Sequence, residues 1–430
     1  MDNWQAGLSV GVFVTAVVLL MTDLLPMPIV GLAGALVLVF TNVISLATAM
    51  EYVGRNHTTL ALFFGVMVMV RSFAPTKIFA YLAAQMIRFS GGKGKNILLG
   101  IAISTGLFSS LLPNATTVLL LAPLLPPLAE LIGVDFVPLL ILMAIAANSG
   151  GLFTLIGDPV NFIVGDFLQM TFGQYLHQMA VSGILTMLVV VITLPFLFPV
   201  LWQSDFGSLA HLPVPPIHHR RTLVVGGVIV LLVVIFFAIG DSLASRITPP
   251  AVALLGATLC MLLSDLTGVD KVSHILRDVD WSTLIFFMSF FVLIGSLEAT
   301  GVIGQIAGFL TPILGQNPGL SVLILLWVTG CLSSLVPNIP LVVAMVPLLN
   351  QYLVNVGSTA IENLPLFYAV IFGGSVGGSA TLIGASANLV AAGVAEQYGR
   401  TLSFAKFLQL GLPIAVAQLL LGSLFLLSKL

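Results

Sequence analysis

Residues 105–123 read TGLFSSLLPNATTVLLLAP, and residues 329–347 read TGCLSSLVPNIPLVVAMVP. The two stretches share Thr-Gly, Ser-Ser-Leu, Pro-Asn and a final Pro at an offset of 224 residues. A second block follows each of them: GGLFTLIGDPVN at 150–161 recurs as GGSATLIGASAN at 377–388, at an offset of 227 residues. Duplicated polar and helix-breaking residues inside hydrophobic sequence are typical of secondary transporters. In those proteins, interrupted segments from two halves of the chain build a binding site near the middle of the membrane.

The composition predicts an integral membrane protein. Hydrophobic residues make up 59% of the 430 residues, charged residues make up 7%, and the mean hydropathy is +1.16. Because soluble proteins carry about 25% charged residues, we expect a lipid bilayer to surround most of the surface. Because the net charge is −2, we expect no nucleic-acid partner.

The cysteines and the N-terminal residues exclude further types of protein and of site. Cys260 and Cys331 are the only cysteines in the sequence, which excludes a disulfide framework and a multi-thiol metal site. We expect no cofactor and no bound metal. The first apolar run follows Met1-Asp2-Asn3-Trp4, without basic residues before it or a small-residue cleavage site after it. We therefore expect a retained membrane span rather than a signal peptide.

Apolar stretches of about 20 residues predict an all-α fold with about ten transmembrane helices. The predicted spans are 8–24, 28–48, 58–73, 137–165, 179–202, 222–240, 249–265, 281–298, 363–393 and 405–428. Two of them, 137–165 and 363–393, contain the glycine blocks and are predicted to be broken helices. The segments 96–129 and 319–350 turn back at Pro113-Asn114 and Pro337-Asn338, and we interpret them as re-entrant hairpins. The alternative is that each segment forms two full transmembrane helices.

The loop charges predict the orientation. With the N-terminus outside, ten Lys and Arg residues fall in cytoplasmic loops and three fall outside, a clear positive-inside bias. The C-terminus is then also outside, and the two halves, 1–203 and 222–430, are inverted repeats joined by a cytoplasmic linker at 204–221. The segment 76–92 is predicted to lie flat on the cytoplasmic face, with 301–315 as its external counterpart.

The repeated polar residues form the candidate substrate site. A hairpin tip offers amide N–H groups at the start of a half-helix, which suit an anion or the oxygen of a neutral ligand. A broken helix offers free carbonyls, which are tolerated in the membrane only where protein or a water-filled cavity satisfies them. The candidates are Asn114, Thr116, Thr117, Asn148, Ser149, Thr154, Asn161, Asn338, Ser375, Ser379, Thr381 and Asn388. The alternative for the small residues is tight helix packing.

Asp158 is the one carboxylate in this set, and Ala385 stands in its place in the second half. An ionisable group at membrane depth is a functional hypothesis by default. We therefore interpret Asp158 as a candidate for proton coupling. The alternative is that it caps the returning half-helix, with Pro159 at the first helical position. The two roles are compatible.

At these blocks the chain resembles the ion-transporter superfamily, and within it the arsenite efflux permeases and the P-protein type permeases. The resemblance covers most of the chain and is strongest over 112–165 and 336–399. It implies two inverted repeats, each with a re-entrant hairpin and a broken helix. In the P-protein type an Asp precedes the tip Asn in both halves, whereas Pro113 and Pro337 stand there in this sequence. This departure speaks against a sodium site at the tips.

The resemblance predicts an arsenite or antimonite efflux permease in a bacterial inner membrane, coupled to proton antiport. Each substrate would be the neutral trihydroxide, held by hydroxyl and amide groups. A sodium- or proton-coupled transporter of inorganic anions or dicarboxylates is one alternative, and a sodium/proton antiporter is another. A homodimer and a cytosolic ATPase subunit are partners that the resemblance allows. No enzyme is expected, because the sequence contains no catalytic constellation at a consistent depth.

Overall fold

The computed structural model describes residues 3–22, 24–207, 216–239, 248–314 and 317–430. Within these ranges the chain is helical, and one isolated bridge between Lys93 and Asp205 is the only β pairing. Part of the predicted linker, 208–215, lies outside the described residues.

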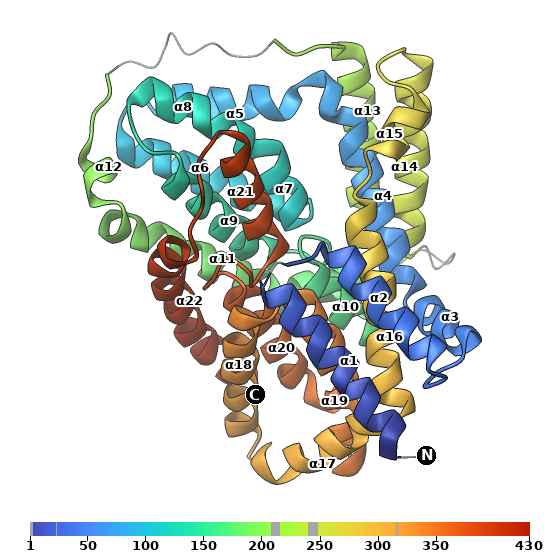
Figure 1. Ribbon diagram of the computed structural model, residues 1–430. Coiled ribbons are helices and arrows are strands. Elements are labelled where there is room, and N and C mark those ends of the chain that lie inside the picture. Colours follow the sequence, from blue (N-terminus) through green and yellow to red (C-terminus); the bar gives the residue numbers. More distant parts are fainter. Residues whose placement is uncertain (1–2, 23, 208–215, 240–247, 315–316) are drawn as a thin grey trace.

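The helices of the two halves follow the same order (Figure 1). The first half contains α1 (Asn3–Thr22), α2 (Met27–Phe40), α3 (Leu46–Arg55), α4 (His57–Phe73), η1 (Ala74–Thr76), α5 (Ile78–Phe89), α6 (Gly94–Ser109), α7 (Asn114–Leu121), η2 (Ala122–Leu124), α8 (Leu125–Ile132), α9 (Val137–Gly151), α10 (Pro159–Phe167), α11 (Phe172–Leu197) and α12 (Pro199–Gln203). The second half contains α13 (Arg220–Ile239), α14 (Pro249–Leu266), α15 (Val272–Arg277), α16 (Trp281–Ala299), α17 (Val302–Leu314), α18 (Pro318–Leu335), α19 (Asn338–Asn355), η5 (Ile361–Asn363), α20 (Leu364–Gly377), α21 (Ser386–Gln397) and α22 (Phe404–Leu427). Each half thus runs through four helices, a short helix, a hairpin, a broken helix and a long helix, after which the first half adds the five-residue α12.

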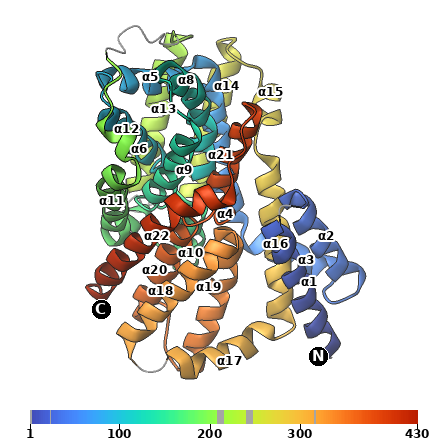
Figure 2. The same cartoon turned by 60° about the vertical axis from the view of Figure 1, so that its left-hand side comes forward.

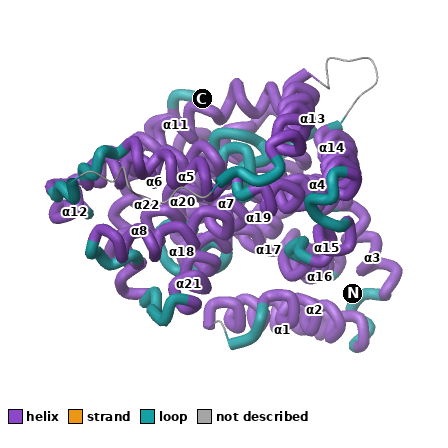
Figure 3. The backbone as a smooth tube through the Cα atoms, turned by 90° about the horizontal axis from the view of Figure 1, so that it is seen from above, coloured by secondary structure: helices purple, strands orange, loops and turns teal. Residues whose placement is uncertain are grey.

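The helices gather into two bundles, which lie on the right and left of Figure 1; in the turned view of Figure 2, α1–α3 and α16 stand on the right, and α13 and α14 overlap with α5 and α8. One bundle contains α1–α4 and α13–α16, in which α4 packs on α14 and α16 packs on α2, so each half contributes to both pairs. The other bundle contains the hairpins, the broken helices, α11 and α22, with α6 on α9 and α18 on α20. Seen from above, α1 and α2 lie along one edge of the molecule (Figure 3). α5 packs on α6, and α17 packs on α19.

The burial of the helices explains which of them form the centre. α9 and α20 are mainly apolar and nearly every residue in them is buried, as expected for helices inside a membrane protein. α1 has only three buried residues, so most of its apolar surface faces outward. Ten described helices are long and apolar enough to cross a membrane, and they include the hairpin arms Asn114–Ile132, Pro318–Leu335 and Asn338–Asn355.

Both predicted hairpins and both predicted breaks are present. The chain turns between α6 and α7 at Pro113, and between α18 and α19 at Pro337. The span 137–165 is interrupted between α9 and α10, and the span 363–393 is interrupted between α20 and α21. The predicted segments 76–92 and 301–315 contain the helices α5 and α17, and residue 315 lies outside the described residues. The inverted relation of 1–203 and 222–430 stays a prediction.

The predicted span 28–48 is wrong as a single helix. α2 ends at Phe40, and α3 begins at Leu46 with Ser45 as its N-cap. Asn42 between them has a φ of 55°, a left-handed conformation that a helix cannot continue through and that Asn tolerates better than most residues. Val43 and Ile44, which follow the turn, are apolar and buried, so the sequence on the two sides of it resembles one continuous span.

Candidate functional site

The two hairpin tips and the second halves of the two broken helices meet at one small cavity of about 20 Å³, which is about the room of one water molecule. Its wall is completed by the middle of α4 and the first turns of α16. It is lined by Phe63, Met67, Pro113, Asn114, Ala115, Thr116, Asp158, Pro159, Asp280, Thr283, Phe287, Asn338, Ile339 and Ser386. Both repeats therefore contribute to the same central space.

Asp158 lies at the centre of this arrangement and is fully buried. Its Oδ1 accepts the backbone N–H of Val160 at 2.9 Å, so it caps α10 as the sequence allowed. Its Oδ2 accepts the side-chain amide of Asn114 at 2.8 Å and the hydroxyl of Ser375 at 3.1 Å. Asp158 thus joins the tip of the first hairpin to α20 of the second half.

The hydrogen bonds continue from Asp158 through three asparagines. Nδ2 of Asn114 also donates to Oδ1 of Asn148 at 3.2 Å. Nδ2 of Asn148 then donates to Oδ1 of Asn388, in the second half, at 3.1 Å. Ser375, Asp158, Asn114, Asn148 and Asn388 therefore form one buried chain of side chains across both halves, and such networks hold a single arrangement when every member is satisfied.

Asn161 and Asn388 hold the breaks in the two helices in the same way. Nδ2 of Asn161 donates to the carbonyls of Gly151 and Thr154, both at 2.8 Å. Nδ2 of Asn388 donates to the carbonyls of Gly378 and Thr381, both at 2.7 Å. Each amide replaces helical partners that the break has removed, which the interior of a membrane protein requires.

Four helix N-termini point at the cavity. α7 begins at Asn114, α10 follows Asp158, α19 begins at Asn338 and α21 begins at Ser386, and each of these regions contributes to the lining. Each N-terminus carries a partial positive charge. The described lining contains no Lys or Arg, and its ionisable groups are Asp158 and Asp280.

The predicted site residues fall into three groups. Asn114, Thr116, Asp158 and Asn338 line the cavity. Asn148, Asn161, Ser375 and Asn388 belong to the surrounding hydrogen bonds. The remaining five predicted residues are buried and do not line the cavity: Thr117, Ser149, Thr154, Ser379 and Thr381.

Three hydroxyls of that third group make hydrogen bonds within the fold, whereas those of Thr117 and Ser379 have no partner among the described residues. Thr154 donates to the carbonyl of Ser110, and Thr381 donates to the carbonyl of Ser334 at 2.5 Å, so each ties a break to its own hairpin. Ser149 donates to the carbonyl of Ile145 at 2.7 Å and accepts from Gln418 of α22 at 2.8 Å. Their predicted contact with substrate stays a prediction.

The sequence did not predict that α4 and α16, which belong to the bundle of α1–α4 and α13–α16, would line the cavity. Asp280 and Thr283 stand at the N-terminus of α16, where Asp280 accepts from the backbone N–H and the hydroxyl of Thr283 at 3.0 and 2.5 Å. In the sequence, the only indication of these two residues was a charged residue next to Trp281, at the boundary of a predicted span. Ser386, at the start of α21, lay inside the repeated block but not among the predicted residues.

A second and larger cavity of about 600 Å³ lies between the two bundles. It is bounded by α3, α10, α16 and α19, and its charged lining residues are Arg55, Asp166 and Glu298. Arg55 pairs with Glu51 at 2.8 Å and with Glu298 at 3.5 Å. The hydroxyl of Thr58, on α4, donates to Asp166, on α10, at 2.6 Å and so links the two bundles. The cavity is in the range of small-molecule sites.

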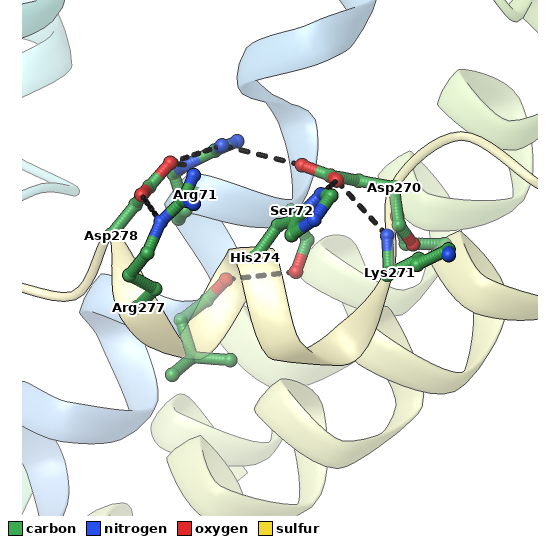
Figure 4. Close-up of polar contacts among 9 residues, drawn as sticks. Arg71, Ser72, Asp270, Lys271, His274, Arg277 and Asp278 are labelled. Carbon is green, nitrogen blue, oxygen red and sulfur yellow. Dashed lines mark hydrogen bonds and ion pairs between the residues drawn. The ribbon is translucent and has the colours of Figure 1, made fainter.

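Arg71 forms a charged cluster at the far end of α4 (Figure 4). Its Nη2 lies 2.5 Å from Oδ2 of Asp278 and 3.2 Å from Oδ2 of Asp270. Asp270 is also contacted by His274 at 2.9 Å. The guanidinium groups of Arg71 and Arg277 hold the pKa of Asp278 below its usual range. The cluster fastens α15 to α4, as expected for a charged residue near the end of a span.

The sequence matches the family described as citrate transporter (CitMHS) over residues 17–371. The chain belongs to the CitMHS family. This CitMHS member is 52% identical to the uncharacterized transporter slr0753 of Synechocystis sp., over 98% of this chain and 97% of that protein. It is 27% identical to the human P protein, over 89% of this chain and 54% of that protein. These matches confirm the superfamily and identify a membrane transporter rather than an enzyme.

Solved structures support the fold of the CitMHS member. The YdaH transporter of Alcanivorax borkumensis aligns with a TM-score of 0.63 over 91% of this chain and 88% of that chain, at 17% identity. MtrF of Neisseria gonorrhoeae aligns with a TM-score of 0.57 over 99% of this chain and 95% of that chain, at 12% identity. Because both identities are low, these two likenesses concern the fold alone.

Proposed function

We propose that this CitMHS-family protein is a secondary active transporter that couples solute movement to protons at Asp158. The observation behind the proposal is the position of this carboxylate, which is fully buried and bonded to both halves of the chain. A buried charge without a cationic partner is costly, so a group that gains and loses a proton suits this place. Protons crossing the membrane would also draw on its potential, at about 2.3 kcal/mol per charge per 100 mV.

For the substrate we propose a small anion of the carboxylate class. Four partly positive helix N-termini surround the cavity, and the family description names citrate. A proton on Asp158 would remove the nearest negative charge and raise the affinity for an anion. The proton and the anion would then move in the same direction. Since the cavity is about 20 Å³, a carboxylate requires the hairpin tips to move away from α4 and α16.

Arsenite or antimonite efflux is the second candidate, and the lining favours it in one respect. The described lining offers amides, hydroxyls and two acids, without Lys or Arg, which suits a small neutral trihydroxide better than a trianion. In this case the solute would leave Asp158 as a proton arrives, so the two would move in opposite directions. We further propose a bacterial inner-membrane location with both termini outside; a homodimer or an ATPase subunit would be compatible with this arrangement.

The direction of coupling distinguishes the two candidates. Purified protein in liposomes would be given labelled citrate, succinate or arsenite under an imposed pH gradient, with and without sodium. We expect carboxylate to accumulate in the compartment toward which protons flow, without a need for sodium. Accumulation of arsenite against the proton flow would support the second candidate instead. Movement that follows sodium and ignores pH would contradict proton coupling, and an Asp135→Asn variant serves as a surface-carboxylate control.

A further inference from the structure

We infer that Ser375 is the positioning residue that transmits the protonation of Asp158, with Asn161 as the second acceptor for its hydroxyl. The inference rests on the proposed proton coupling at Asp158. It assigns to Ser375 a role as a switch between two partners, in addition to its predicted place near the substrate. The evidence is a comparison of matching positions in the two repeated halves.

The matching positions Asn148 and Ser375 carry different residues. At the offset of 227 residues, Asn148 corresponds to Ser375 and Asn161 corresponds to Asn388. Asn148 donates to Oδ1 of Asn388 at 3.1 Å. The matching contact would join Ser375 to Oδ1 of Asn161, since α10 packs on α20 as α21 packs on α9. The hydroxyl of Ser375 donates to Asp158 instead.

This difference leaves a buried acceptor without a donor. Oδ1 of Asn161 is fully buried and has no hydrogen-bond partner in the described structure. Such an atom is costly and calls for an explanation. Asp158 and Asn161 are three residues apart at the start of α10, so they lie on one face of the helix. The carboxylate of Asp158, which has hydrogen-bond donors, and Oδ1 of Asn161, which has none, are therefore one turn apart on the side of α10 that faces Ser375.

The chemistry of the three groups accounts for the arrangement. Ionised Asp158 only accepts, and at Oδ2 it accepts from both Ser375 and Asn114. A proton added to Oδ2 makes it a donor, and an amide N–H cannot accept from it. A serine hydroxyl can both accept and donate. Ser375 would then accept a hydrogen bond from protonated Asp158, which keeps its proton, and would turn its own hydrogen toward Oδ1 of Asn161, with no other bond broken.

Few other ionisable groups face Asp158. Tyr175 of α11 interacts electrostatically with Asp158 and with Tyr368 of α20. The phenol of Tyr175 donates to the carbonyl of Leu152 at 3.2 Å. Asp280 shares the cavity from α16. Among the described residues no cation contacts Asp158, so its hydroxyl and amide donors set the balance between its two protonation states.

The protonation of Asp158 can be measured directly. Infrared difference spectra of the purified full-length protein would be recorded across pH, with the carboxylic acid band assigned by its loss in Asp158→Asn. We expect Ser375→Ala to move the midpoint upward by about one pH unit, because the charge-assisted hydrogen bond lost from the ionised form is stronger than the neutral one lost from the protonated form. Ser375→Thr keeps the hydroxyl and should keep the midpoint. Ser296→Ala, a buried serine of α16 bonded only within its helix, is the matched control.

A second variant tests the role of Asn161. Ser375→Asn restores the residue found at the matching position, and its amide can donate to Oδ1 of Asn161. We expect a protein with an unchanged or raised unfolding temperature, a midpoint shifted upward as in Ser375→Ala, and slowed proton-coupled citrate uptake. A wild-type midpoint in both Ser375→Ala and Ser375→Asn would overturn the inference while leaving proton coupling intact. A band that survives in Asp158→Asn would instead overturn the proposed function.

Discussion

The asparagines of the broken helices show how single residues make irregular backbone stable at the centre of the molecule. A break leaves carbonyls without N–H partners, and water cannot supply them inside a buried core. Asn161 and Asn388 each bring two N–H bonds to such carbonyls from one amide group. Their equal geometry in the two halves indicates a structural requirement that is separate from substrate binding.

We expect Asn161→Leu and Asn388→Leu, which keep the branching at Cγ but remove the donors, to destabilise the protein by about 2 kcal/mol or more. Each substitution leaves two buried carbonyls unsatisfied, at about 1–3 kcal/mol per group. Thermal unfolding of detergent-purified protein measures the effect. Asn355→Leu, at an exposed asparagine bonded to Gln351, is the control. Equal unfolding temperatures for all three variants would contradict the role of the amides.

At the scale of elements, the hairpins cross the broken helices through glycines. A Cβ at Gly150 of α9 would overlap the backbone of Gly106 of α6, and a Cβ at Gly377 of α20 would overlap that of Gly330 of α18. Small residues allow this close approach of helices in membrane proteins. The crossing fixes where each hairpin tip lies relative to the break that it faces.

Alanine at either crossing should force the helices apart. We expect Gly150→Ala and Gly377→Ala to lower the unfolding temperature and to reduce transport, because the backbone in contact cannot yield as a flexible side chain can. Gly393→Ala in α21 meets nothing within 4 Å and should be neutral or slightly stabilising. The prediction fails if alanine at Gly150 and Gly377 is tolerated as well as at Gly393.

The cluster around Arg71 connects α4 to the α15–α16 junction and should depend on pH. Because the folded pKa of Asp278 is lowered, its contribution to stability is present above the unfolded value of about 3.9 and is lost as pH falls through the folded value. Asp278→Asn lacks the contribution at every pH. We expect the unfolding temperatures of wild type and variant to differ at pH 7 and to converge below about pH 4.

The control for this cluster is Asp265→Asn, which removes an exposed carboxylate of α14 that makes no ion pair among the described residues. It should follow the wild-type curve at every pH. A difference between wild type and Asp278→Asn that stays constant down to pH 3 would show that the stability of the cluster does not depend on this ionisation.

At the scale of the whole molecule, the sequence could predict the elements better than the contacts between them. The hairpins and the breaks were predictable because Pro-Asn and Gly-Gly interrupt apolar runs in duplicate. The turn at Asn42 was not, because apolar stretches on both sides of Thr41-Asn42 resemble one continuous span, and a single Asn tolerates the left-handed conformation without requiring it. The bond between Asp158 and Ser375 was not predictable either, because hydrophobic periodicity does not say which face of α20 meets α10.

The orientation of the whole molecule is open to a direct labelling test. Both termini lie toward the end of the molecule that also holds α17 (Figure 1). In a variant without Cys260 and Cys331, we expect Ile361→Cys, in the exposed connection before α20, to react with an impermeant maleimide in intact cells. Lys95→Cys, at the exposed start of α6, should react only after permeabilisation. The reverse pattern would invert the proposed topology.

Proton movement through Asp158 is the central claim, and it can be measured without knowing the final direction of transport. Liposomes containing the protein and a trapped pH-sensitive dye would receive citrate or arsenite from outside, beside a counterflow assay of the same solute. We expect wild type to show a pH change that accompanies the solute. Asp158→Asn should retain counterflow of solute but lose the pH change. An unchanged pH response in Asp158→Asn, with solute still moving, would contradict the claim that this carboxylate carries the proton.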